Sequence, residues 1–283
     1  MAALHGRATI GRRTLLKALL TGGIGAATGV GSYGYLYERH HLEITRADVA
    51  VAGIPRELSG LRIGLITDIH RSAWVSDDDV RHAAAMLMGE RPDLIVLGGD
   101  YVTRADRRYM TPAAEAFRTL SAPHGVFAIL GNHDDDRAMP AALSKIGAQV
   151  LRDARTRLMI SGVPLELAGI RFWTRRSADI EDVVRGASGT VVLLAHDPRR
   201  LSEAAGLGIP LVLSGHTHGG QVVLPLAGAL AAQKFPVVAG VGRRLGTTIF
   251  VSRGVGTVYV PLRVNCPPEV AVLTLGLDGP VNV

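Results

Sequence analysis

The sequence is poor in cysteine, in aromatic residues and in long basic runs, and each shortage excludes a class of function. Cys266 is the only cysteine among 283 residues, which excludes an internal disulfide and a cysteine-based zinc site. Aromatic residues make up 5% of the chain. With so few aromatic side chains and no basic stretch in the body of the chain, no nucleic-acid-binding surface is evident.

The positive charge of the chain is concentrated near its N-terminus. Residues 1–46 hold six basic and two acidic residues, so they account for +4 of the formal net charge of +6. A hydrophobic fraction of 47% with 20% charged residues is typical of a globular protein. The length suits one large α/β domain or two small ones, and we expect one because no linker or repeat is visible.

A basic, weakly apolar segment opens the chain. Its run Arg12-Arg13-Thr14-Leu15-Leu16-Lys17 resembles the twin-arginine export signal, and an ordinary signal or a short membrane anchor is the alternative. Glycine occurs six times between residues 22 and 34, which disfavours a structural helix of the body because each glycine costs about 1 kcal/mol. The stretch is marginal for a membrane span, which needs about 20 apolar residues. We predict a signal or anchor over 1–40 and one folded domain over 41–283.

In the first half of the body, apolar stretches typical of buried strands alternate with helical patterns. This alternation predicts an α/β fold with parallel crossovers. Three of the apolar stretches stop at residues 68, 100 and 132, a spacing that suits one strand–helix–strand unit each. Parallel strands place such ends on one sheet edge, where α/β proteins form their sites.

Residues that commonly bind metals follow successive strands. His216 and His218 stand among small residues in the segment LSGHTHGG, and residues two apart on a strand face the same side. Histidine, carboxylate and amide donors without thiolate suit Mn, Fe, Zn or Co. The donors exceed the needs of one four-coordinate ion and suit two ions about 3.5–4 Å apart. The full series is Asp68, His70, Asp100, Asn132, His133, His196, His216 and His218.

The ordered blocks DIH, GGD, GNHD, AHDP and GHTHGG, between residues 61 and 220, resemble the motifs of the calcineurin-like metallophosphoesterases. The later stretch FVSRGVGTVYVPLRVNCPPEVAVLTL resembles the bacterial phosphodiesterase subgroup typified by YaeI and YkuE, whose members often carry twin-arginine leaders. The resemblance implies a four-layer αββα sandwich of two mixed β-sheets flanked by helices. It also implies an enzyme with two divalent metal ions that hydrolyses a phosphodiester or phosphomonoester by attack of a metal-bound hydroxide.

The resemblance also implies roles for single residues. The first metal would be held by Asp68, His70, Asp100 and His218. Asp100 would bridge to the second metal, which is completed by Asn132, His196 and His216. Asn132 would also contact substrate, and His133 would contact phosphate or protonate the leaving alkoxide, with Asp134 orienting it. Arg253 and Arg104 are predicted phosphate clamps, because a guanidinium offers a fork of donors.

Two other functions remain open at this point. One is a lipid-processing pyrophosphohydrolase of the UDP-2,3-diacylglucosamine type, which an apolar groove above the metals would favour. The other is a non-catalytic binding protein on the same fold, which the intact ligand set argues against. From the leader we expect the cell envelope, either periplasmic or membrane-anchored through the N-terminus, with the twin-arginine translocase as export partner.

Overall fold

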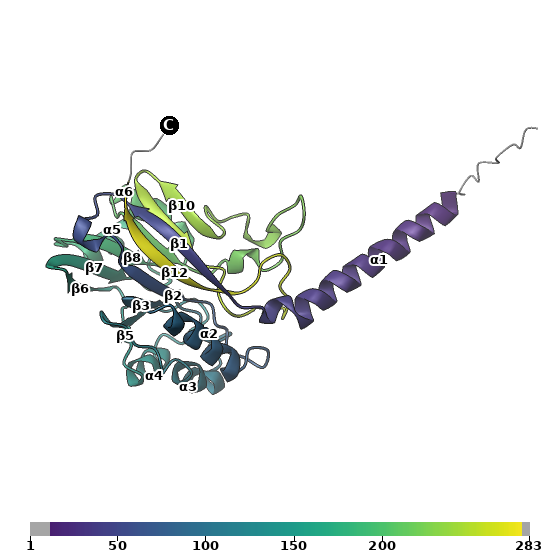
Figure 1. Cartoon of the computed structure of the whole chain (residues 1–283), viewed down its shortest axis with the longest axis horizontal. Coiled ribbons are helices and arrows are strands. Elements are labelled where there is room, and N and C mark those ends of the chain that lie inside the picture. The colour runs from purple at the N-terminus through teal and green to yellow at the C-terminus, as the bar shows by residue number, and fades with distance from the viewer. Residues whose placement is uncertain (1–11, 279–283) are drawn as a thin grey trace, which may run out of the picture.

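A computed structural model shows the architecture of the chain (Figure 1) and describes residues 12–278. Parts of both predicted segments, residues 1–11 of the leader and 279–283 of the domain, lie outside the described residues. The first sheet is mixed. Strands β2 to β5 are mutually parallel, β12 is antiparallel to β2, and β1 is parallel to β12. Its spatial order is β1 (Glu43–Val51), β12 (Glu269–Leu277), β2 (Arg62–Ile66), β3 (Leu94–Leu97), β4 (Val126–Ala128) and β5 (Gln149–Val150).

Three helices make the predicted crossovers between β2 and β5, and Figure 1 shows them together on one side of the sheet. Ser76 caps the first of them at its N-terminus. The Ser76 hydroxyl accepts a bond from the Asp79 backbone N–H at 3.1 Å, and the Asp79 carboxylate accepts one from the Ser76 N–H at 2.8 Å. The helices are α2 (Asp77–Gly89), α3 (Arg107–Glu115) and α4 (Met139–Lys145).

The second sheet is also mixed, with a parallel centre and antiparallel strands at both edges. Its order is β10 (Gly240–Arg244), β11 (Thr247–Val251), β9 (Leu211–Ser214), β8 (Thr190–Leu194), β7 (Val163–Gly169) and β6 (Ala154–Ile160). Helices α5 (Ser177–Val184) and α6 (Leu201–Gly206) accompany it. Short 3₁₀ turns connect the elements, namely η1 (Glu38–His40), η2 (Arg56–Leu58), η3 (Pro198–Arg200), η4 (His218–Gly220) and η5 (Leu230–Ala232).

Strand alternation explains why the two sheets stack with helices outside them. Along β3, Val96 packs between the sheets, whereas Leu97 packs under α2 and α3. Along β8, Leu194 packs between the sheets and Leu193 packs under α5 and α6. Both faces of each central strand are therefore buried, and the predicted four-layer αββα sandwich is confirmed.

The leader forms an unbroken helix, α1 (Arg12–Leu36), which projects from the body (Figure 1). Its glycines do not prevent a helix, but this helix is mostly exposed and is not a structural helix of the body. Five of the six glycines, at positions 22 to 31, face open space, so they do not pack against the body. Within residues 12–278, no helix is both long enough and apolar enough to cross a bilayer.

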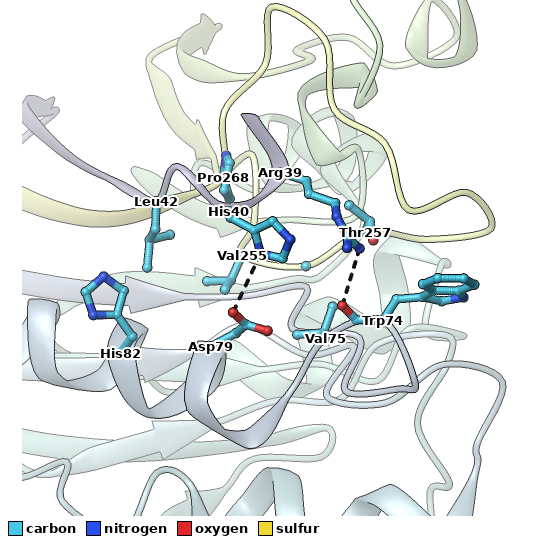
Figure 2. Close-up of a pocket in the computed structure, with 11 residues that line it drawn as sticks. Arg39, His40, Leu42, Trp74, Val75, Asp79, His82, Val255, Thr257 and Pro268 are labelled. Atoms are coloured by element: carbon cyan, nitrogen blue, oxygen red, sulfur yellow. Dashed lines mark hydrogen bonds and ion pairs between the residues drawn. The ribbon is translucent and has the colours of Figure 1, made fainter. Parts of the chain in front are cut away.

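The C-terminal end of α1 and the residues that follow it pack against the body. A Cβ on Gly34 would lie 2.3 Å from the carbonyl oxygen of Arg263, so only glycine permits this approach. Glu38 is buried, and its carboxylate accepts a hydrogen bond from the Cys266 backbone N–H at 2.5 Å. Figure 2 shows the neighbouring joint with α2, where His40 Nδ1 lies 3.9 Å from an oxygen of Asp79. A cavity of only about 30 Å³ remains there, and the predicted metal ligands lie outside it.

Candidate metal centre

The seven predicted ligands all lie just beyond the carboxyl ends of strands. The first sheet supplies four of them, following β2, β3 and β4, and the second sheet supplies three, following β8 and β9. The two sheets stack with these ends together, so ligands more than 100 residues apart meet between them. The first sheet gives Asp68, His70, Asp100 and Asn132, and the second gives His196, His216 and His218.

Asp68, His70 and His218 form the first of two groups. All three are buried, and one donor atom of each lies within 4.8 Å of the others. Nε2 of His70 is 3.1 Å from Nε2 of His218, which in turn is 3.4 Å from Oδ1 of Asp68. Two imidazole lone pairs at this distance repel each other unless a proton or a cation lies between them.

Asp100, His196 and His216 form the second group, again with donor atoms within 4.8 Å of one another. Oδ2 of Asp100 lies 3.2 Å from Nε2 of His196 and 3.4 Å from Nε2 of His70, which belongs to the first group. One carboxylate oxygen thus faces both groups. This is the position of a bridging ligand between two ions.

Unsatisfied buried atoms show that the site suits bound cations. Oδ1 of Asn132 and Nε2 of His196 are buried and make no hydrogen bond, a condition that is costly in a protein interior. Nδ1 of His196 lies 2.7 Å from the carbonyl oxygen of Gly98, so this nitrogen carries a proton and Nε2 is the nitrogen that can bind a cation. His70 is held from behind in the same way, with Nδ1 3.2 Å from the hydroxyl of Thr103. The donors present therefore fit two ions of the Mn, Fe, Zn or Co type.

The backbone at the ligands is strained in a way that serves the site. Asp68, His70, Asp100, His216 and His218 all have positive φ, between 49° and 72°. Residues other than glycine rarely adopt this region, and the surrounding structure has to hold them there. In addition, a Cβ on the neighbouring residue 215 would lie 2.1 Å from Oδ2 of Asp68, which explains the glycine at that position.

The electrostatics favour neutral imidazoles around a charged pair. Burial is the main cause that lowers the pKa of His70 to about 3 and that of His216 to about 4. Burial also acts on His196, but the charges of Asp100 and Asp68 outweigh it and raise its pKa to about 10. Burial likewise opposes ionisation of Asp100, whose pKa is nevertheless lowered by His196. Without metal, the centre therefore holds a proton on His196 that an incoming cation has to displace.

His133 lies beside the first group, its ring centroid 4.9 Å from that of His70. Its Nδ1 accepts a hydrogen bond from the backbone N–H of Arg104 at 3.0 Å. The proton of the neutral ring is therefore on Nε2, where it can be donated. Burial lowers the pKa of His133, which keeps the ring neutral at physiological pH.

Two predicted roles are wrong. The Asp134 carboxylate does not orient His133, because it accepts hydrogen bonds from the backbone N–H groups of Asp100, Tyr101 and Gly131 at 2.8–2.9 Å. Asp134 instead ties the loops after β3 and β4 together. Arg253 does not clamp phosphate, since its guanidinium binds Glu269 at 2.9 Å and Glu43 at 3.1 Å. Both corrections come from tertiary contacts that no local pattern reveals.

Arg104 stays a predicted clamp, because its side chain is exposed and lies near Tyr259, whose ring centroid is 5.9 Å from that of His133. Its guanidinium lies 5.8 Å from the ring centroid of Tyr259. Tyr259 and Val260 separate two cavities, one of about 420 Å³ that includes Arg104 and one of about 410 Å³ that includes His216.

Gln221 holds the backbone on both sides of Tyr259 in place. Its side-chain amide donates to the carbonyl oxygens of Val258 and Val260, and its carbonyl accepts the Val258 N–H at 2.9 Å. The sequence gives no signal for Tyr259 or for this contact.

Comparison with known proteins agrees with this geometry. The profile of the family described as calcineurin-like phosphoesterase matches residues 61–220. The chain therefore belongs to the calcineurin-like phosphoesterase family, and it is a metal-dependent phosphoric ester hydrolase.

Within the family, the chain is similar to two bacterial proteins over almost its whole length. It is 31% identical over 277 residues to the uncharacterized metallophosphoesterase YkuE of Bacillus subtilis, covering 93% of this chain and 97% of that protein. It is 30% identical over 275 residues to the phosphodiesterase YaeI of Escherichia coli, covering 94% and 99%. Among solved structures, a dimetal phosphatase from Danio rerio matches with a TM-score of 0.45 at 13% identity, over 70% of this chain and 88% of that one.

Proposed function

We propose that the protein is a phosphodiesterase that works with two divalent ions, one in each ligand group. The observation that carries this proposal is the placement of Oδ2 of Asp100, which faces His70 of the first group and His196 of the second. The similarity to a protein named phosphodiesterase YaeI supports the reaction class. The intact ligand set argues against a purely non-catalytic binding role.

The side chains have separate tasks in this reaction. When bound, the two ions would supply positive charge for the phosphate oxygens and lower the pKa of water toward neutrality. His133 donates a hydrogen bond from Nε2 to the leaving oxygen and so stabilises the negative charge that develops there, and the Arg104 backbone N–H keeps the ring in that tautomer. Asn132, whose Oδ1 has no protein partner, contributes to the second group and to substrate contact. The guanidinium of Arg104 binds the part of the substrate that enters the neighbouring cavity.

The test compares two model esters with the metal-loaded protein. Metal-free protein is reloaded with Mn²⁺ and assayed with bis-p-nitrophenyl phosphate and with p-nitrophenyl phosphate. We expect Mn²⁺-dependent hydrolysis of both, with the higher kcat/KM for the diester. Higher kcat/KM for the monoester would make the protein a phosphomonoesterase, and no metal-dependent turnover of either would favour the binding-protein alternative.

A second candidate function is hydrolysis of a lipid pyrophosphate or phosphodiester. The cavity of about 410 Å³ beside His216 and His218 favours it, because its other walls are mainly apolar, including Val222, Leu230 and Phe235. Kinetics with phosphodiesters that carry alkyl chains of increasing length provide the test. We expect KM to fall as the chain lengthens, and the fall to be smaller in Leu230→Asn. A KM independent of chain length would remove this candidate.

For location, we propose the cell envelope, with export through the twin-arginine translocase. The run from Arg12 to Lys17 supports this proposal, because two arginines precede apolar residues and a lysine. Between Arg12 and Leu36 there is no acidic residue, and Leu16, Leu20 and Ile24 are exposed on α1. A cationic helix with exposed apolar residues can bind at a membrane surface without crossing it.

A further inference from the structure

Arg263 is the largest fully buried side chain of the described residues, at 0% exposed. It lies in the stretch between β11 and β12, which contains neither a metal ligand nor His133. Arginine is almost never fully buried unless its charge is paired. Within residues 12–278, however, Arg263 makes hydrogen bonds only to backbone carbonyls, apart from a long contact of 3.9 Å to Sγ of Cys266.

The guanidinium of Arg263 joins two parts of this loop. Nη2 donates to the carbonyl oxygens of Gly256 at 2.6 Å, Arg253 at 2.8 Å and Gly254 at 3.1 Å. Nη1 donates to the carbonyl oxygen of Cys266 at 3.0 Å. These acceptors lie in different directions around one planar group, so a forked guanidinium can serve them together and a lysine ammonium cannot.

Both parts of the loop hold the backbone of the first ligand group. The Gly256 N–H donates to the carbonyl oxygen of Asp68 at 2.7 Å, and the Val255 N–H donates to that of Thr67 at 3.1 Å. On the other side, the thiol of Cys266 donates to the carbonyl oxygen of His218 at 3.2 Å. Burial raises the pKa of this thiol, so it keeps its proton for the bond.

The residues held in this way are ones that need support. Asp68 and His218 have φ values of 53° and 52°, which they do not adopt without a restraining environment. His216 and His196 of the second group are linked instead through Gly215, whose N–H donates to the His196 carbonyl at 3.1 Å. The loop that Arg263 organises is therefore placed mainly behind the first group.

We propose that Arg263 is a positioning residue for the first metal, acting through the loop 253–266 on Asp68 and His218. This goes beyond the proposed phosphodiesterase activity, because it concerns occupancy of one metal group rather than choice of substrate. Residues behind a metal ligand typically change metal affinity by about 10–100-fold when they are replaced. Arg263 acts one contact further away, through a shared loop.

The test measures metal content and metal–metal coupling in Arg263→Lys and Arg263→Met. Metal-free protein is titrated with Mn²⁺ and examined by metal analysis and electron paramagnetic resonance. We expect two coupled ions in the unmodified protein and one uncoupled ion in both variants, with the weaker site about 10–100-fold weaker. The spectra of His218→Asn and His216→Asn, which disable the first and second groups, identify the ion that remains.

Arg155→Met is the matched control. Like Arg263, Arg155 donates to backbone carbonyl oxygens, those of Val183 and Arg185, and it also binds the buried carboxylate of Glu166, but it lies on β6 at the far edge of the second sheet. Glu166 keeps a second partner in Arg157 at 2.9 Å, so this variant should fold and bind two coupled ions. Two coupled ions at unmodified affinity in both Arg263 variants would overturn the proposal. So would failure of both variants to fold while Arg155→Met folds, since Arg263 would then serve the stability of the whole domain.

Discussion

The backbone N–H of Arg104 donates a hydrogen bond of 3.0 Å to Nδ1 of His133, and this bond decides which ring nitrogen of the histidine carries the proton. A neutral histidine held in this tautomer can donate a hydrogen bond from Nε2 to a leaving oxygen but cannot use Nδ1 as a base. A main-chain contact therefore decides which nitrogen of His133 is the hydrogen-bond donor. Replacing the Arg104 side chain should leave this contact unchanged.

Replacing His133 should separate chemistry from metal binding. We expect His133→Asn to keep both ions and to lower kcat for alkyl phosphodiesters by about 10²–10³-fold, the usual effect of removing a hydrogen-bond donor to developing negative charge. The loss should be much smaller for p-nitrophenyl esters, whose leaving oxygen is stabilised by its own ring. Rates with a series of leaving groups provide the measurement. An equal loss across the series would show that His133 binds phosphate instead.

Replacing Asp100 should remove the bridge. In Asp100→Asn, the oxygen that faces both His70 and His196 belongs to a neutral amide. We expect the variant to bind fewer than two ions and to lose nearly all turnover, because a neutral ligand is a poor bridge between two dications. Metal analysis and activity are measured on the same sample. A variant with two ions and normal turnover would rule out the bridging role.

Metal binding should release protons and strengthen as the pH rises. The pKa of His196 in the metal-free centre is raised to about 10, so this ring is protonated at neutral pH and has to lose a proton to bind a cation. The affinity for Mn²⁺ should therefore increase between about pH 6 and 9, up to the limit set by metal hydroxide formation. Calorimetry in buffers of different ionisation enthalpy counts the protons. Affinity independent of pH, with no proton release, would contradict this assignment.

The leader prediction is tested by a substitution that keeps the charge. Arg12→Lys combined with Arg13→Lys leaves the charge and the hydrophobicity of α1 unchanged, so a general secretion signal should tolerate it. The twin-arginine route should not, and we expect active enzyme to accumulate in the cytoplasm. Cell fractionation with activity assays is the measurement. Normal delivery of the double variant to the envelope would identify an ordinary signal or anchor.

The ligands could be predicted from sequence because each one directly follows an apolar strand. That pattern is local, and Asp68, Asp100 and Asn132 even repeat at a constant interval. The parallel strands could be predicted for the same reason. In contrast, β6 and β10 are edge strands with exposed positions and weak apolar patterns, so they and the second sheet came only from the family resemblance.

The roles of Asp134, Arg253 and Arg263 could not be predicted because their partners are distant main-chain or side-chain groups. Asp134 looked like a partner of His133, but it is used by three backbone N–H groups from two loops. Arg253 looked like a free cation, but Glu269 and Glu43 neutralise it. A sequence shows which side chains could bind phosphate, whereas only the fold shows which of them are already occupied.

The packing of Gly34 and Glu38 limits how the chain can be matured by proteases. Cleavage anywhere between residues 12 and 33 would remove exposed helix and leave both contacts in place. Cleavage beyond Glu38 would remove the carboxylate that binds the Cys266 N–H, and with it one restraint on the loop behind His218. Cleavage there is therefore expected to weaken the metal centre, so we expect any processed chain that keeps its activity to retain Glu38.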